Sequence, residues 1–129
     1  MDRRIVTVFG GTGFVGRHIV KRLLERDFIV RVPTRSFERV KKLKPMGYLG
    51  QVVPVHCDVR DEDSIKDAIE GSEAVINLLG ILYERGSKNF LNIHVKAAKR
   101  IAEEAKATGV KTLLHMRSEE RRVGKECAM

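Results

Sequence analysis

Three glycines near the amino terminus have the spacing of a phosphate-binding turn. Gly10, Gly13 and Gly16 follow an apolar run at residues 4–9 and open an amphipathic segment at residues 13–26. Between a strand and a helix, the first glycine permits a tight turn, the second lets the backbone approach a pyrophosphate, and the third allows close helix packing. Free N–H groups at the helix start then face the phosphates. The predicted cofactor-binding residues of this segment are Gly10, Thr12, Gly13, Phe14, Val15, Gly16 and Arg17. The alternative is a glycine-rich turn without a ligand.

The end of the second predicted strand bears on which dinucleotide would bind. An acidic residue at this place hydrogen-bonds the ribose 2′-OH of NAD, whereas an arginine accommodates the 2′-phosphate of NADP. Residues 32–36 read VPTRS, and the nearest downstream carboxylate is Glu38. Arg35 offers a planar guanidinium to a phosphate, the Ser36 hydroxyl could assist, and Arg17 is a second candidate. The sequence therefore predicts NADP(H) in preference to NAD(H), and solvated surface arginines are the alternative.

Two further strand ends should border the same ligand. Asp58 and Val59 follow the third predicted strand, where an adenine ring would lie. Asp58 could accept a hydrogen bond from the adenine amino group, or it could equally cap the next turn. Leu79 and Gly80 end the fourth predicted strand, beside the expected nicotinamide ribose. The loop at residues 81–87 would then lie on the ligand side of the sheet.

Strand-like and helix-like patterns alternate along the chain, as an α/β fold requires. Strands are predicted over residues 4–9, 28–32, 51–57, 74–79 and 110–116, and helices over 13–26, 37–43, 61–71 and 91–109. Pro33 should close the second strand, and Pro54 fits best on an edge strand. Right-handed crossovers give a Rossmann-type doubly wound parallel sheet with strand order 3-2-1-4-5. We expect this sheet to be incomplete on its carboxyl-terminal side.

Composition narrows the class of protein. A chain of 129 residues supports one domain. No apolar run approaches the roughly 18 residues of a membrane helix, and the first strand begins directly after Met1–Arg4, so we expect no transmembrane segment and no signal peptide. These features predict a cytoplasmic protein.

Charged residues and potential metal ligands point to no additional binding site. The net charge of +8 is spread over helical stretches and mixed with acidic residues, and the chain has no Trp, so solvated helix faces are favoured over nucleic acid. Cys57 and Cys127 lack metal-ligand spacing and are interpreted as reduced thiols. No histidine pairs at helical spacing with another ligand type. No metal site is therefore predicted.

These motifs together resemble the short-chain dehydrogenase superfamily in its extended and atypical branches. The closer similarity is to bacterial relatives of the nucleotide-binding accessory subunit of respiratory complex I, alpha-subcomplex subunit nine. The similar stretches are residues 10–17, 50–55, 58–60, 74–85 and 94–95. The resemblance implies a fold like that of NAD-dependent epimerases and dehydratases, binding of NADP(H), and respiratory-complex or quinone-pathway proteins as partners.

The chain departs from the superfamily at the residues that carry out its chemistry. The Tyr-x-x-x-Lys pair that acts as general acid and base is absent, because Val52 and Ser87 stand four residues after Tyr48 and Tyr83. Residues 117–129 have neither strand nor helix character that would continue the fold, so we expect a partial dinucleotide-binding domain at 1–116 and a non-native tail at 117–129. The sequence thus predicts a chain without catalytic residues. A non-catalytic accessory or assembly factor with a structural cofactor is the alternative to an oxidoreductase.

Overall fold

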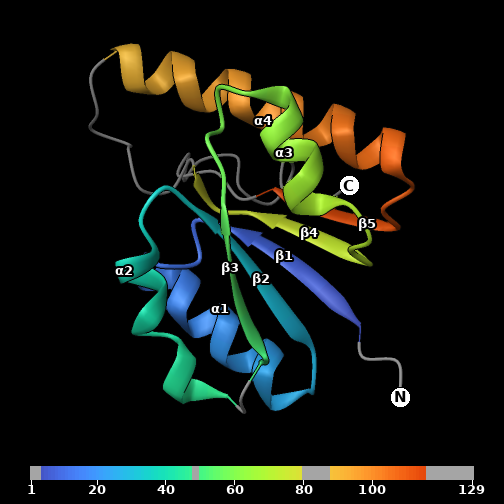
Figure 1. The fold of residues 1–129 in the computed structure, drawn as a ribbon. Coiled ribbons are helices and arrows are strands. Elements are labelled where there is room, and N and C mark those ends of the chain that lie inside the picture. Colours follow the sequence, from blue (N-terminus) through green and yellow to red (C-terminus); the bar gives the residue numbers. More distant parts are fainter. Residues whose placement is uncertain (1–3, 48–49, 80–87, 116–129) are drawn as a thin grey trace, which may run out of the picture.

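A computed structural model describes residues 4–47, 50–79 and 88–115, with the side chains of 88–95 not included. Strands and helices alternate in the order expected (Figure 1). The elements are β1 (Ile5–Phe9), α1 (Phe14–Glu25), β2 (Ile29–Thr34), α2 (Phe37–Lys41), the short 3-10 helix η1 (Lys44–Met46), β3 (Val52–His56), α3 (Glu62–Ile69), β4 (Ala74–Asn77), α4 (Lys88–Thr108) and β5 (Thr112–His115). Helix α4 begins three residues before the predicted start.

The sheet is parallel throughout and has the strand order β3-β2-β1-β4-β5. This confirms the predicted doubly wound topology. Strand β1 lies in the middle, with Val6 level with Val30 of β2 and with Ala74 of β4. The chain leaves β1 toward β2 and returns from β3 to β4, so the strand order reverses beside β1. In such sheets ligands bind outside the carboxyl ends of the strands at this switch point.

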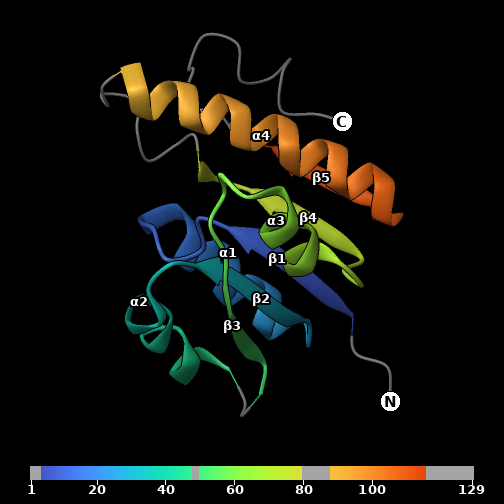
Figure 2. The same cartoon turned by 45° about the horizontal axis from the view of Figure 1, so that its top comes forward.

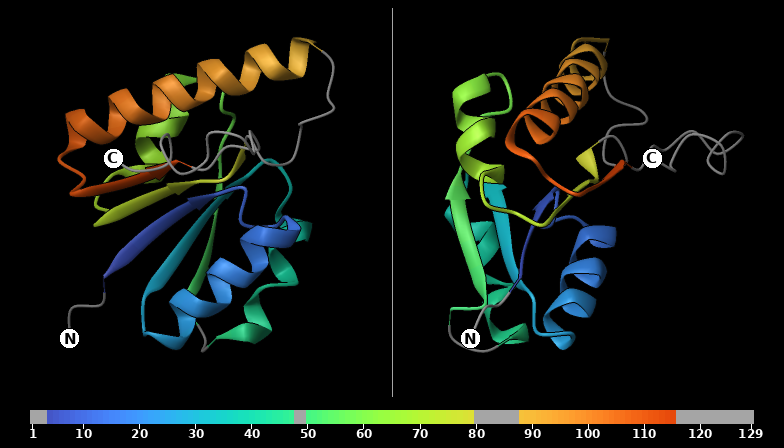
Figure 3. Two further views of the ribbon diagram at one scale, coloured as in Figure 1. Left: turned by 180° about the vertical axis from the view of Figure 1, so that it is seen from behind. Right: turned by 90° about the vertical axis from the view of Figure 1, so that its right-hand side faces the viewer.

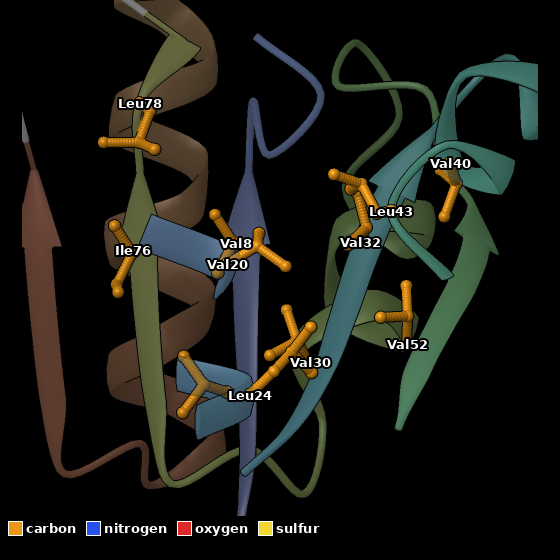
Figure 4. Close-up of a cluster of buried hydrophobic side chains, with 11 residues drawn as sticks. Val8, Val20, Leu24, Val30, Val32, Val40, Leu43, Val52, Ile76 and Leu78 are labelled. Carbon is orange, nitrogen blue, oxygen red and sulfur yellow. The ribbon is translucent and has the colours of Figure 1, made fainter. Parts of the chain in front are cut away.

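Two helices cover each face of the sheet, as Figures 1 and 3 show from opposite sides. Helices α1 and α2 lie on one face, and α3 and α4 pack against each other on the other face, as Figure 2 also shows. Figure 4 shows the core of the first face, whose buried side chains are Val6, Val8, Val20, Leu24, Val30, Val32, Val40, Leu43, Val52, Ile76 and Leu78. The second core comprises Phe9, Cys57, Ile65, Ala68, Ile69, Val75, Ile101 and Ala105. Each buried valine or isoleucine contributes roughly 1.5–3 kcal/mol, and together they fix the strands that present the site.

Pro54 lies on an edge strand, as its lack of an N–H group led us to expect. In β3 the odd-numbered residues face β2, because Gln51 O accepts from Val30 N at 2.8 Å and Cys57 N donates to Thr34 O at 3.0 Å. The nitrogen of Pro54 therefore points to the open side of the sheet, where no hydrogen bond is lost.

The prediction that Pro33 closes the second strand is wrong, because β2 runs through it to Thr34. Odd-numbered residues of β2 face β1, since Ile29 N donates to Arg4 O at 2.9 Å. Pairing of β2 with β1 ends at Arg31, so Pro33 lies beyond the part of β2 that is bonded to β1. The strand can continue because its pairing with β3 does not need that N–H group.

Candidate functional site

Gly10 makes the turn that follows β1 at the switch point. Its φ is +83°, in the left-handed region that glycine adopts without strain. Its carbonyl oxygen accepts a hydrogen bond from Gly13 N at 3.2 Å, which closes the turn. A Cβ at this position would lie 3.2 Å from the carbonyl carbon of Leu78, just after β4. The turn is therefore held tightly between the carboxyl ends of β1 and β4.

Gly16 sets how closely α1 approaches that turn. A Cβ there would lie 2.7 Å from Gly11 Cα and closer still to Gly10 O. Both neighbours are backbone atoms that cannot move away like the end of a flexible side chain. Only glycine thus fits at this position, and its absence of a side chain brings the start of α1 directly onto the turn.

The first turn of α1 has N–H groups with no acceptor in the described part of the chain. Gly13 is the N-cap and offers no side-chain acceptor, and the first turn carries no carboxylate. Arg17 N bonds to Gly13 O at 2.9 Å, but no such bond is made by the N–H groups of Phe14, Val15 and Gly16. These groups and the helix dipole make this end positive. An anion of two phosphates fits this place, and the exposed Phe14 ring leaves the backbone accessible on that side.

Arg35 and Ser36 follow β2 in a turn that Thr34 organises. The Thr34 hydroxyl accepts from Ser36 N at 2.9 Å and donates to Ser36 O at 3.0 Å. Ser36 is then the N-cap of α2, and its own hydroxyl makes no capping bond there. Arg35 is exposed beside it. This pair therefore presents a guanidinium and a hydroxyl at the carboxyl edge of the sheet, as a 2′-phosphate would require.

Asp58 caps the turn after β3, which is one of the two roles left open by its position. Its Oδ1 accepts from Arg60 N at 3.0 Å and from Arg60 Nε at 3.2 Å, while Oδ2 accepts from Arg60 Nη2 at 3.1 Å. These bonds, and the charge of Arg35 to a smaller degree, lower the pKa of Asp58 to about 2. The carboxylate is therefore ionised and ion-paired at neutral pH.

Two of the remaining predicted contacts are held by hydrogen bonds between their backbone and a neighbouring side chain. Leu79 N donates to Asn77 Oδ1 at 3.1 Å, and Val59 O accepts from Arg100 Nη1 at 3.3 Å. Both Leu79 and Val59 pack partly against the second core. Gly80, with the loop at 81–87, lies outside the described residues, as do Tyr48, Tyr83 and the predicted tail at 117–129.

Three polar side chains that join separate elements of the fold were missed by sequence reasoning, and two of them, Asn77 and Gln51, are buried. Asn77 Nδ2 lies 3.0 Å from His115 Nδ1 and joins the ends of β4 and β5. Arg31 donates to Ala68 O at 2.7 Å and to Glu70 O at 2.8 Å, and desolvation lowers its pKa. Gln51 Nε2 donates at 2.9 Å to Leu24 O, at the end of α1. The sequence shows only that each is a polar residue in or next to an apolar strand. That position does not reveal the partner of the side chain.

The described residues show neither a metal cluster nor a membrane-spanning helix. No three side chains of the His, Cys, Asp and Glu types are placed to share an ion within these ranges. No helix among them is both long and apolar enough to cross a bilayer. The buried Cys57 thiol lies in the second core, and burial raises its pKa.

The fold and the glycine turn define a Rossmann-type domain. Solved structures share this fold: a putative epimerase from Bacteroides thetaiotaomicron has a TM-score of 0.68, with 23% identity over 89% of this chain and 47% of that chain. Uronate dehydrogenase from Agrobacterium tumefaciens complexed with NAD has a TM-score of 0.70, with 23% identity over 89% and 41%. The profile of the NmrA-like family matches residues 2–125, and the chain belongs to that family.

Curated relatives confirm the expected resemblance to the complex I subunit. The chain is 45% identical to "NADH dehydrogenase [ubiquinone] 1 alpha subcomplex subunit 9, mitochondrial" of Dictyostelium discoideum, over 79% of this chain and 29% of the relative. It is 36% identical to the "NADH-ubiquinone oxidoreductase 40 kDa subunit, mitochondrial" of Neurospora crassa, over 94% of this chain and 32% of the relative. The chain thus spans about a third of the length of these relatives.

Proposed function

We propose that this chain binds a dinucleotide at the switch point, with the pyrophosphate on the first turn of α1. The observation that carries the proposal is the start of this helix. Gly16 brings the helix onto the turn, and the N–H groups of Phe14, Val15 and Gly16 have no acceptor in the described part of the protein. A diphosphate would satisfy these groups and the positive end of the helix dipole together. The solved uronate dehydrogenase complex with NAD, which shares this fold, is consistent with such a ligand.

The remaining contacts follow from the strand ends. Arg17 would add a positive charge near the pyrophosphate, Arg35 and Ser36 would hold a 2′-phosphate, and the backbone at Val59 and a free lone pair of Asp58 would face the adenine. Leu79 and Gly80 would border the nicotinamide ribose. The bound nucleotide would supply hydride chemistry, whereas the residues of this chain bind and orient it.

A direct test is isothermal titration with each nucleotide in turn. Val is compatible with the Gly13 backbone, whose φ is −76°, so Gly13→Val should leave the fold intact. Its side chain would occupy the space of the pyrophosphate, so we expect binding of both NADPH and NADH to be lost. Full affinity in this variant, or no binding by the unsubstituted protein, would refute the proposed site.

We further propose that the ligand is NADP(H) rather than NAD(H). The support is the exposed Arg35 at the end of β2, where a carboxylate would favour a ribose hydroxyl. Arg35→Asp should weaken NADPH by roughly 1–3 kcal/mol, the scale of a charge-assisted hydrogen bond. Arg26→Asp makes the same change of charge at the far end of α1 and should alter little. Equal affinities for NADPH and NADH in the unsubstituted protein would contradict the preference.

We infer that the chain as given does not turn over a substrate, and that it serves as a nucleotide-binding module in a larger assembly. Hydride transfer needs a positioned acid or base for the accompanying proton, and neither Tyr48 nor Tyr83 has a lysine four residues on. The names of the complex I relatives favour respiratory-complex or quinone-pathway proteins as partners. We further propose that the cofactor is structural and that the protein is cytoplasmic or peripheral to the inner membrane. An oxidoreductase acting on a quinone or a sugar nucleotide is the second candidate. Steady NADPH oxidation with such a substrate, above a Gly13→Val control, would favour the oxidoreductase.

We also propose that the dinucleotide-binding domain comprises residues 1–116 and that residues 117–129 are a non-native tail. The support for this division is the charged composition of 117–129, where six of the nine residues from 117 to 125 are Arg, Lys or Glu. Limited proteolysis with mass spectrometry tests it. Rapid cleavage after Arg117, Arg121 or Arg122 with survival of 1–116 is expected, and a protease-resistant tail would show that it belongs to the fold.

A further inference from the structure

The ends of β2 and β3 bring a cation and an anion side by side at the proposed 2′-phosphate site. Thr34 is level with His56 in the parallel register, and Cys57 N donates to Thr34 O at 3.0 Å. Arg35 and Asp58 each follow directly after one of these two bonded residues. They are close enough that the charge of Arg35 contributes to the lowered pKa of Asp58. A carboxylate therefore stands beside the arginine that would receive the phosphate.

A carboxylate at this place should oppose NADP(H). An acidic residue near the end of β2 favours a ribose hydroxyl by accepting its hydrogen bond and repels a 2′-phosphate. Asp58 reaches the same neighbourhood from the adjacent strand. Asp58 and a bound 2′-phosphate would carry like charges several ångströms apart, and like charges at that separation repel each other. Left unpaired, Asp58 would offset a substantial part of the attraction that Arg35 provides.

Arg60 neutralises the charge of Asp58 through two side-chain hydrogen bonds. Its Nε and Nη2 donate to Oδ1 and Oδ2 of Asp58 at 3.2 and 3.1 Å, and its backbone N–H donates to Oδ1 at 3.0 Å. Both carboxylate oxygens are thus engaged on the side of Arg60. Parallel N–H bonds from one guanidinium fix the orientation of the pair as well as its charge.

We propose that Arg60 is a second determinant of nucleotide preference, which acts by neutralising Asp58 beside the phosphate site of Arg35 and Ser36. The inference rests on the proposed binding of a dinucleotide and assigns Arg60 a positioning role without contact to the ligand. The competing explanation is a direct bond from Arg60 to the 2′-phosphate. The two explanations differ in what happens when Asp58 loses its charge.

The test is a double-mutant cycle read as the ratio of NADPH to NADH dissociation constants. Arg60→Gln should shift this ratio about three- to tenfold toward NADH, because a free carboxylate then faces the phosphate. Adding Asp58→Asn should restore the ratio, since the amide carries no charge. The Oδ1 of the amide still accepts from the backbone N–H of residue 60, so the turn is preserved. Adenine contacts are common to both nucleotides and cancel in the ratio.

A matched control is Arg4→Gln, which breaks an exposed ion pair with Glu73 at 3.6 Å. This pair lies at the amino ends of β1 and β4, away from the proposed site. The substitution should leave the ratio unchanged. An unchanged ratio in Arg60→Gln would overturn the inference, and so would a ratio that Asp58→Asn fails to restore, because Arg60 would then contact the phosphate directly. Failure of the unsubstituted protein to bind either nucleotide would instead overturn the proposed function itself. Thermal unfolding of each variant separates these outcomes from misfolding.

Discussion

Helices α1 and α3 begin at the same edge of the sheet, on opposite faces, and satisfy their first turns in opposite ways. Helix α3 supplies its own anions: the Asp61 side chain accepts from Asp63 N at 3.1 Å, and Glu62 adds a further carboxylate. Helix α1 begins at Gly13 with no side-chain cap and no acidic residue in its first turn. The helix dipole and the unpaired N–H groups are common to both. The difference is that α3 has a side-chain cap and carboxylates at its positive end, whereas α1 has neither.

The contrast extends to the glycines near each helix. Gly71, just beyond the end of α3, has a positive φ of +84° and nothing near a prospective Cβ. At Gly16, the atoms closest to a prospective Cβ are all backbone atoms. One glycine is required by its own conformation, and the other by its surroundings. The predictions below test these two distinctions.

The largest effect is expected from Gly16→Ala. The methyl group would run into the backbone of Gly10 and Gly11, so we expect a loss of about 3 kcal/mol or more in the free energy of unfolding. Gly71→Ala is the matched control and should lose about 1 kcal/mol, from left-handed strain alone. Urea denaturation followed by circular dichroism measures both. Similar losses in the two variants would mean that α1 can move away from the turn.

Giving α1 its own carboxylate should make it resemble α3. Phe14 is 69% exposed, so Phe14→Asp removes little packing. We expect NADPH and NADH to bind about tenfold more weakly, a loss of about 1.4 kcal/mol, because a fixed negative charge competes with the pyrophosphate. The protein without nucleotide should gain about 0.5 kcal/mol of stability from the helix dipole.

Phe14→Asn is the neutral control for this charge. It has nearly the same shape as aspartate and can also cap, but it carries no charge. Titration calorimetry should find most of the affinity retained in Phe14→Asn. An equal loss of affinity in both variants would assign the effect to the missing ring, and the comparison with α3 would fail.

Removing the cap of α3 should affect folding and leave the ligand site untouched. Asp61→Ala leaves the Asp63 N–H without its acceptor and should lower the free energy of unfolding by about 1 kcal/mol. Asp67→Ala, an exposed change in the same helix, should stay within about 0.5 kcal/mol of the unsubstituted protein. Nucleotide affinity should be unaltered in both. A weakened affinity in Asp61→Ala would show that the two helix starts are coupled.

The smallest expected effect is on the stability at low pH that Asp58 contributes in the turn before α3. Arg60 holds the pKa of Asp58 near 2, below its ordinary value of 3.8, so the ionised form stabilises the folded state. This contribution is fully present above pH about 4 and is lost as the pH falls through about 2. Asp58→Asn should therefore flatten that part of the unfolding profile and leave its slope near pH 7 unchanged. A parallel shift of the whole profile would assign Asp58 a role other than ion pairing.

Local patterns were sufficient to predict the order of the strands and the glycine turn. The apolar run of β1 and the spacing of Gly10, Gly13 and Gly16 each act within a few residues of chain. Pro54 was placed correctly because an absent N–H group requires an open edge. Pro33 was interpreted wrongly because its tolerance depends on how far β2 is bonded to β1, which its own neighbours do not reveal.

Side-chain partners distant in sequence could not be predicted. Arg31 bonds to carbonyl groups 37 and 39 residues away, and Asn77 meets His115 across 38 residues. Both alternatives for Asp58 were open because the choice depends on the orientation of Arg60. Sequence identifies which groups need a partner, and only the packed sheet decides which partner each receives.

The proline in β3 also gives the sheet a preferred direction of growth. A strand approaching β3 from outside would meet the Pro54 nitrogen, which has no hydrogen to donate, in the middle of the strand. At the opposite edge of the described sheet, β5 has the sequence Thr-Leu-Leu-His, and each of these residues carries an N–H group. A further strand would therefore lose a hydrogen bond at β3, whereas on the described part of β5 the N–H groups of Thr112 and Leu114 face away from β4. Of the two edges of the described sheet, β5 is the one that offers a donor at each outward-facing residue.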